Sequence, residues 1–97
     1  MPRKARRIEA ALLAKGFQRT DAKHRKFAYV TIRGIESRIR TLLSHGGNRD
    51  IDDRLLATMA RQCGLSRREF VALIDCPLTQ DDYEALLVER GAIDPSH

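Results

Sequence analysis

The sequence predicts an α+β protein: one helix, a three-stranded antiparallel sheet and a second helix (α-β-β-β-α), followed by two short C-terminal helices. Three observations lead to this prediction. Hydrophobic residues recur at helical spacing near both ends of the chain, they alternate with polar residues through the middle, and glycine or proline stands where one pattern gives way to the next. With 97 residues, 42% of them hydrophobic, the chain fits a single domain, residues 1–97. We expect a core over 1–64 and a helical extension over 65–97.

The first half of the chain changes from helical to strand patterning at a glycine. Residues 5–15 place Ile8 and Leu12 on one helical face, and Gly16 is a typical helix end. Three stretches rich in β-branched and aromatic residues follow, separated by turn-like segments. We expect strands at 17–20, 26–32 and 37–43.

The second half returns to the helical period. One expected helix face carries Ile51, Leu55, Leu56, Met59 and Cys63, and Gly64 closes the turn after it. Aspartates at positions 50, 52 and 53 suit the amino end of this helix.

Two further helix starts share one pattern. Ser66 and Thr79 are expected as N-caps, with Glu69 and Asp82 three residues later as reciprocal partners. Pro77 separates the two helices. This pattern predicts two short C-terminal helices.

Charge is distributed unevenly along the chain. Residues 1–49 contain 13 Lys and Arg against 3 Asp and Glu, whereas residues 50–97 contain 5 against 10. A basic half joined to an acidic half indicates a face for a polyanion such as nucleic acid. A soluble domain with solvated charges explains the same numbers, so charge alone leaves both interpretations open.

Other classes of chemistry find little support. Cys63 and Cys76 stand in helical patterns and are expected as reduced, half-buried thiols. We expect no metal and no cofactor, because the cysteines and histidines lack zinc spacing and no glycine-rich phosphate loop is present. No apolar run approaches the length of a membrane helix, so we expect a cytoplasmic protein without membrane attachment.

Four segments carry a resemblance to a known family: "LLAKGFQ" (12–18), "KHRKF" (23–27), "TLLSHGG" (41–47) and "LATMARQCGLSRREFVAL" (56–73). In this order they resemble the HicA-type mRNA interferase toxins, whose fold is similar to double-stranded-RNA-binding domains. The resemblance covers roughly residues 5–74. It implies an endoribonuclease of a toxin–antitoxin system, with His24 as the residue for RNA cleavage and an antitoxin-type protein as partner.

The chemistry of His24 fits that role. An imidazole with an unperturbed pKa near ~6.5 can accept a proton from a ribose 2′-OH. Neighbouring cations disfavour its protonated form, which favours a general base over an acid. The alternative is an exposed histidine at a strand end without a role, and His45, in the turn-like "SHGG", is a second-choice site.

Six basic residues are the candidates for contacts with RNA phosphates. Arg38 and Arg40 alternate with Ile39, so they share one face of the third strand. Tyr29 is a candidate for stacking on a base, or else a core residue. The six candidates are Arg19, Lys23, Arg25, Lys26, Arg38 and Arg40.

Two alternatives belong to other functional classes. Residues 55–74 resemble a helix-turn-helix in which Arg67 and Arg68 begin the recognition helix, which indicates DNA binding. A non-catalytic protein-interaction module is the other alternative. Its acidic helical end would dock a partner or form a homodimer.

Overall fold

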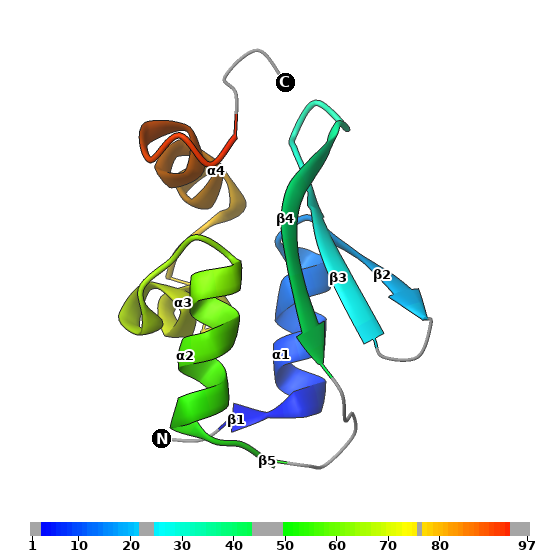
Figure 1. Cartoon of the computed structure of the whole chain (residues 1–97), viewed down its shortest axis with the longest axis vertical. Coiled ribbons are helices and arrows are strands. Elements are labelled where there is room, and N and C mark those ends of the chain that lie inside the picture. Colours follow the sequence, from blue (N-terminus) through cyan, green and yellow to red (C-terminus); the bar gives the residue numbers. More distant parts are fainter. Residues whose placement is uncertain (1–2, 22–24, 44–49, 76, 94–97) are drawn as a thin grey trace.

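The strands expected in the middle of the chain form one antiparallel sheet with the order β2–β3–β4 (Figure 1). The computed structural model describes residues 3–21, 25–43, 50–75 and 77–93. The three strands are β2 (Phe17–Asp21), β3 (Arg25–Val30) and β4 (Glu36–Leu43). The helices are α1 (Ala5–Ala14), α2 (Asp53–Gln62), α3 (Arg67–Ile74) and α4 (Gln80–Glu89). The predicted α+β class, the three-stranded antiparallel sheet and the four helices are confirmed.

Helix α1 packs its apolar side against the sheet and the C-terminal helices. Ile8 and Leu12 are fully buried, as the helical spacing predicts. Lys15 follows the helix and donates from Nζ to the carbonyl oxygens of Leu73 (3.1 Å) and Leu78 (2.5 Å), which ties α1 to both ends of the α3–α4 connection. Gly16 then adopts φ +100°, a left-handed conformation that favours glycine.

The caps of the C-terminal helices follow the sequence pattern. Asp52 caps α2 by accepting the Leu55 N–H (2.9 Å). At α3, the Ser66 hydroxyl accepts the Glu69 N–H (3.1 Å) while the Glu69 carboxylate accepts the Ser66 N–H (2.8 Å), a complete capping box. At α4, the Thr79 hydroxyl accepts the Asp82 N–H (3.1 Å). The predicted N-caps of α3 and α4 are confirmed.

A second, two-stranded ribbon was not expected. β1 (Arg3–Lys4) pairs antiparallel with β5 (Asp50–Ile51), so the start of the chain lies beside the segment that leads into α2. Ile51 is therefore a buried strand residue rather than part of the helix. The prediction that Leu55 belongs to the buried face of α2 is wrong, because its exposed fraction is 37%.

The central strand is shorter than the sequence predicts. β3 ends at Val30, and the chain turns because the Thr31 N–H bonds to the Ile35 carbonyl oxygen (2.9 Å). Ile32, expected as the last strand residue, instead lies on the surface with 55% of its area exposed.

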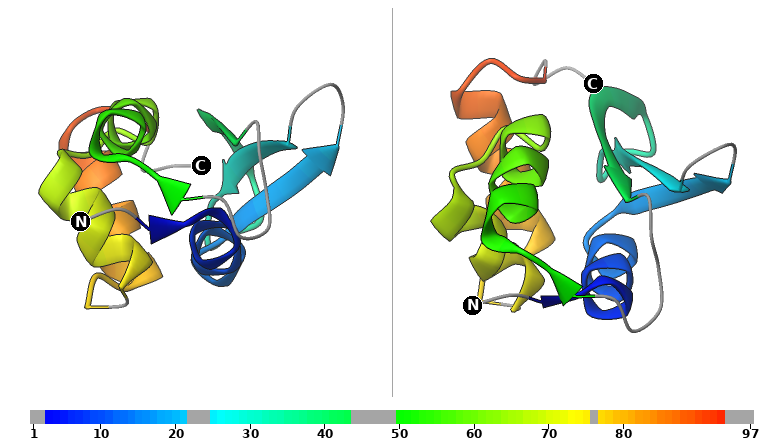
Figure 2. Two further views of the ribbon diagram at one scale, coloured as in Figure 1. Left: turned by 90° about the horizontal axis from the view of Figure 1, so that it is seen from below. Right: turned by 60° about the horizontal axis from the view of Figure 1, so that its bottom comes forward.

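One hydrophobic cluster joins all four helices to one face of the sheet. Near its centre, the rings of Phe17, Tyr29 and Tyr83 lie with centroids 5.0–5.8 Å apart. Cys63 is a free thiol and fully buried, rather than half-buried as predicted, whereas Cys76 lies outside the described residues. α2, α3 and α4 stand on one side of the molecule and the sheet on the other (Figures 1 and 2). No helix in the described ranges is long and apolar enough to span a membrane.

Candidate nucleic-acid interface

The register of the sheet separates its two faces. Gln18, Ala28 and Arg40 lie opposite one another on neighbouring strands, and Thr20, Lys26 and Leu42 form the next such row. Residues directly opposite in antiparallel strands point to the same face. These two rows therefore define what we call the outer face, which no described helix covers (Figure 2).

Three of the predicted phosphate contacts lie on the outer face. Along β4, exposed and buried residues alternate strictly, which places Arg38 and Arg40 outward and Ile39 inward, as predicted. Lys26 comes from β3 and is a diagonal neighbour of Arg40. Diagonal neighbours have Cβ atoms roughly 7–8 Å apart, close enough for long side chains to contact one bound strand.

The outer-face cations form few and weak interactions with the rest of the protein. Arg40 meets Glu36 at 3.4 Å and donates to the Ser37 carbonyl oxygen at 3.0 Å. Its pair with Glu36 is exposed, and such pairs contribute about 0–1 kcal/mol. Lys26 and Arg38 are exposed and form no ion pair with another described residue. A phosphate therefore meets little competition at these three side chains.

Two other predicted contacts lie on the opposite, helix-facing side. Arg19 and Arg25 each bind the Glu9 carboxylate of α1, with N–O distances of 3.1 Å in both pairs. The side chain of Glu9 is only 19% exposed. This paired carboxylate fastens α1 to β2 and β3 and neutralises part of the charge of both arginines.

The alternation of side chains along β2 and β3 is enough to separate these two arginines from the outer-face cations. Arg19 is two residues from buried Phe17, and Arg25 is two residues from buried Phe27, so each shares the inner face of its strand. The prediction of six phosphate contacts did not apply this alternation to Arg19 and Arg25.

Lys23, His24 and His45 lie outside the described residues. The described residues beside them are nevertheless neighbours, because Arg25 pairs with Asp21 on one side and with Leu43 on the other. The described ends of β2, β3 and β4 therefore adjoin at Asp21, Arg25 and Leu43.

Every aromatic residue of the chain is buried. Tyr29 has no exposed area, and its hydroxyl donates to the Glu84 carboxylate at 2.6 Å. Stacking of Tyr29 on a base, considered from the sequence, is thus excluded in this fold. Because no aromatic platform is exposed, the outer face offers contacts to the phosphate backbone rather than base stacking.

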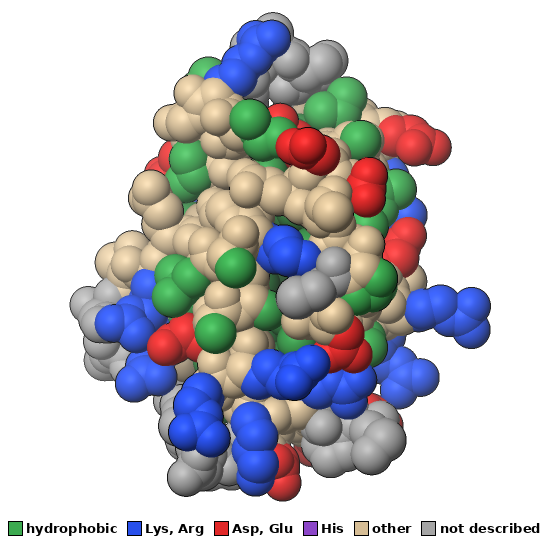
Figure 3. All heavy atoms as spheres, turned by 180° about the vertical axis from the view of Figure 1, so that it is seen from behind, with side chains coloured by type: hydrophobic (Ala, Val, Ile, Leu, Met, Phe, Trp, Pro, Cys, Tyr) green, Lys and Arg blue, Asp and Glu red, His purple; other side chains and the backbone are tan. Residues whose placement is uncertain are grey.

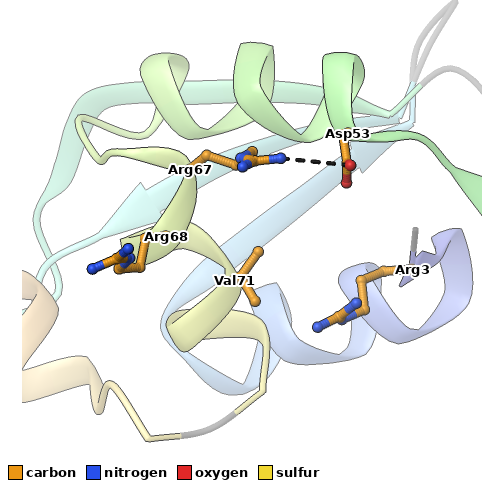
Figure 4. A pocket seen from close by; sticks show the side chains of 5 residues that line it. All are labelled: Arg3, Asp53, Arg67, Arg68 and Val71. Atoms are coloured by element: carbon orange, nitrogen blue, oxygen red, sulfur yellow. Dashed lines mark ion pairs between the residues drawn. The ribbon is translucent and has the colours of Figure 1, made fainter. Parts of the chain in front are cut away.

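The two helices and the turn expected over residues 55–74 are observed as α2, a turn at Gly64 (φ +77°) and α3. Arg67 and Arg68 project from the first turn of α3 beside a hollow of about 250 Å³, also lined by Arg3 and Asp53 (Figure 4). Aspartate carboxylates already neutralise part of the positive charge of these arginines. Arg67 meets Asp53 at 3.5 Å, and Arg3 binds Asp75 at 2.8 Å.

The wider charge distribution follows the two halves of the chain. On the face seen in Figure 3, Lys and Arg gather over the lower half, and acidic side chains lie mainly above them. Arg7 also binds Asp75 (3.2 Å), and Lys4 binds Asp50 (2.9 Å). The cations near the start of the chain therefore stabilise contacts with the acidic half, so they are not all free for a polyanion.

Within the described ranges, no group of three His, Cys, Asp or Glu residues is arranged to hold a metal ion. Comparison with protein-family models, with curated proteins and with solved structures finds no match to this chain.

Proposed function

We propose that this protein is an RNA-binding endoribonuclease that holds its substrate on the outer face of the sheet. The observation that carries the proposal is the placement of Lys26, Arg38 and Arg40 on a face that no described helix covers. The acidic residues of α4 and the Asp-rich start of α2 belong to other elements. An RNA strand along the outer face is therefore attracted by cations on two adjacent strands.

Binding of this kind is electrostatic and tolerant of sequence. Each neutralised phosphate of a single strand contributes about 0.7 to the slope of log affinity against log salt. Three contacts give a slope of about −2. Without exposed aromatic residues, selection among bases rests on hydrogen bonds from residues such as Gln18 and Thr20, which line the same face.

In this proposal, His24 is the general base. It stands one residue before Arg25, where β3 begins, and the resemblance to HicA-type mRNA interferases assigns it to RNA cleavage. The imidazole would take the proton of a ribose 2′-OH, whose oxygen then attacks the adjacent phosphorus and expels the 5′-oxygen of the next nucleotide. The same resemblance supports mRNA as substrate and an antitoxin-type partner. The cytoplasmic location expected from the sequence is part of the same proposal.

DNA binding through the α2–α3 hairpin is the second candidate. It is favoured by Arg68, which is exposed at the start of α3 beside Arg3 and Arg67. It ranks lower because Asp53 and Asp75 lie within ion-pair distance of two of these three arginines. A DNA phosphate approaching the hollow would be repelled by both carboxylates.

The test is incubation of an end-labelled single-stranded RNA with the wild-type protein and with His24→Ala. We expect cleavage to yield 2′,3′-cyclic phosphate ends, and His24→Ala to abolish cleavage while retaining binding. A DNA strand of the same sequence should bind without being cut, because it lacks the 2′-OH. Binding without wild-type cleavage would refute the nuclease assignment, and stronger binding to duplex DNA than to RNA would favour the α2–α3 hairpin.

A further inference from the structure

A groove runs between α4 and the turn that joins β3 to β4. One hollow of about 420 Å³ is lined by Ile32 and by residues of α4, including Ala85 and Val88. A second, of about 450 Å³, shares Ile32 and Asp81 with the first and continues to Leu13 of α1. The two hollows therefore adjoin at Ile32 and Asp81, and we call them together the groove; the outer-face cations line neither of them.

The lining of the first hollow is mainly apolar, and that of the second is mixed. Ile32 has 55% of its area exposed and Leu13 has 46%, although the chain buries every aromatic residue. Ala85 and Val88 add aliphatic area from α4. Contiguous exposed apolar residues rimmed by polar ones are typical of interaction sites.

The groove is also acidic. Asp81, Glu84 and Glu89 line it, and none of the described Lys or Arg residues lines either hollow. Asp81 and Glu89 form no ion pair with another described residue. Among the described residues, Glu84 accepts from two neutral donors, the Tyr29 hydroxyl and the Ile32 N–H, and forms no ion pair with a cation.

We propose that this groove binds a basic amphipathic segment of a partner protein. Aliphatic side chains of the partner would cover Ile32, Ala85 and Val88, and its Lys or Arg side chains would meet Asp81 and Glu89. Charge complementarity selects this occupant. An RNA strand would be repelled by the carboxylates, and an acidic or purely apolar segment would leave them without partners.

The experiment is a titration of the ¹⁵N-labelled full-length protein with a synthetic helical peptide of leucine and lysine, whose leucines form one stripe. We expect amide shifts at Ile32 and along α4, and no saturable binding of a matched peptide in which glutamate replaces lysine. Asp81→Lys should weaken binding about tenfold, which corresponds to about 1.4 kcal/mol. Asp82→Lys is the matched control, because it makes the same charge change in the same helical turn but does not line the groove.

If Asp81→Lys and Asp82→Lys lose the same peptide affinity, binding depends only on net charge. That result would overturn the groove as the binding site. Shifts confined to residues away from α4 and Ile32 would also overturn it. Concentration-dependent shifts of the α4 amides without peptide would assign the groove to a second copy of this chain instead. These outcomes are independent of RNA binding, which is measured with different ligands and different variants.

Discussion

Tyr29, in the central strand, donates its hydroxyl hydrogen to the Glu84 carboxylate of α4 across 2.6 Å. The same carboxylate oxygen accepts the backbone N–H of Ile32 at 2.9 Å, just after the strand ends. The Glu84 side chain therefore joins α4 both to the middle of β3 and to the residues that follow its end. α4 is thus part of the fold that supports the sheet rather than a separate appendage.

Tyr29→Phe tests this connection. The change removes a hydrogen bond to a charged acceptor, so we expect the free energy of unfolding to fall by about 1.5–3 kcal/mol. Urea denaturation followed by circular dichroism measures it. Glu89→Gln changes an exposed residue at the end of the same helix, so it should stay within about 0.5 kcal/mol of wild type. Equal effects of the two variants would show that the Tyr29–Glu84 bond contributes nothing specific.

Gly16 and Gly34 form a matched pair for a test of packing. Both have positive φ, +100° and +85°, so alanine costs about 1–2 kcal/mol of backbone strain at either position. An added Cβ at Gly16 would lie 3.0 Å from a ring carbon of buried Tyr29, whereas at Gly34 it would meet nothing within 4 Å. We therefore expect Gly16→Ala to be the more destabilising variant by about 1–3 kcal/mol in urea denaturation. The reverse order would contradict the observed packing of the α1–β2 turn against β3.

Acid should remove a specific contribution of Glu69 to stability. Hydrogen bonds from Arg90, followed by those from Ser66, lower the pKa of Glu69 from 4.5 to about 2. Because the folded-state pKa lies below the unfolded one, this contribution is complete above about pH 4.5 and is lost as the pH falls toward 2. In Glu69→Gln, the stability difference from wild type should therefore shrink over this range.

The measurement for Glu69 is urea denaturation of both proteins at a series of pH values. Asp75, whose pKa is lowered mainly by its hydrogen bond from Arg3, responds to acid in the same direction. It is present in both proteins, so the difference between their curves isolates Glu69. A difference that stays constant from pH 7 to pH 2 would contradict the paired geometry.

Cys63 should be unreactive in the folded protein. Burial raises the pKa of its thiol to about 12, and the side chain has no exposed area. In a Cys76→Ser background, a disulfide reagent such as DTNB at pH 8 should label Cys63 only after urea unfolds the chain, because the thiolate is the reactive form. Rapid labelling without denaturant would show that the core around Cys63 opens readily.

The sequence is sufficient to predict the main helices and strands, because the patterns that indicate them lie within a few neighbouring residues. Helical spacing places Ile8 and Leu12 inward, alternation places Arg38 and Arg40 outward, and the caps at Ser66 and Thr79 lie within three residues of their partners. The β1–β5 ribbon has no such signal. Each of its strands has two residues, and the two segments meet only through tertiary packing.

The candidate site was predictable only in part for the same reason. Alternation within β2 and β3 is enough to place Arg19 and Arg25 on the inner face, but it does not reveal that Glu9 holds both of them. The bond between Tyr29 and Glu84 spans 55 positions of the chain and leaves no local pattern. The acidic groove has the same origin, because the bond from the Ile32 N–H to Glu84 of α4 spans 52 positions of the chain.

The most direct test of RNA binding by the outer face compares two double variants that lose the same charge from opposite faces. Fluorescence anisotropy with a labelled single-stranded RNA at several salt concentrations gives affinity and salt slope for Lys26→Gln/Arg38→Gln and for Arg19→Gln/Arg25→Gln. We predict that the outer-face variant loses about 1.4 from the salt slope, corresponding to two phosphate contacts, and that the helix-side variant keeps the wild-type slope while remaining folded. Equal losses in both variants, or a loss confined to the helix-side variant, would contradict RNA binding by the outer face.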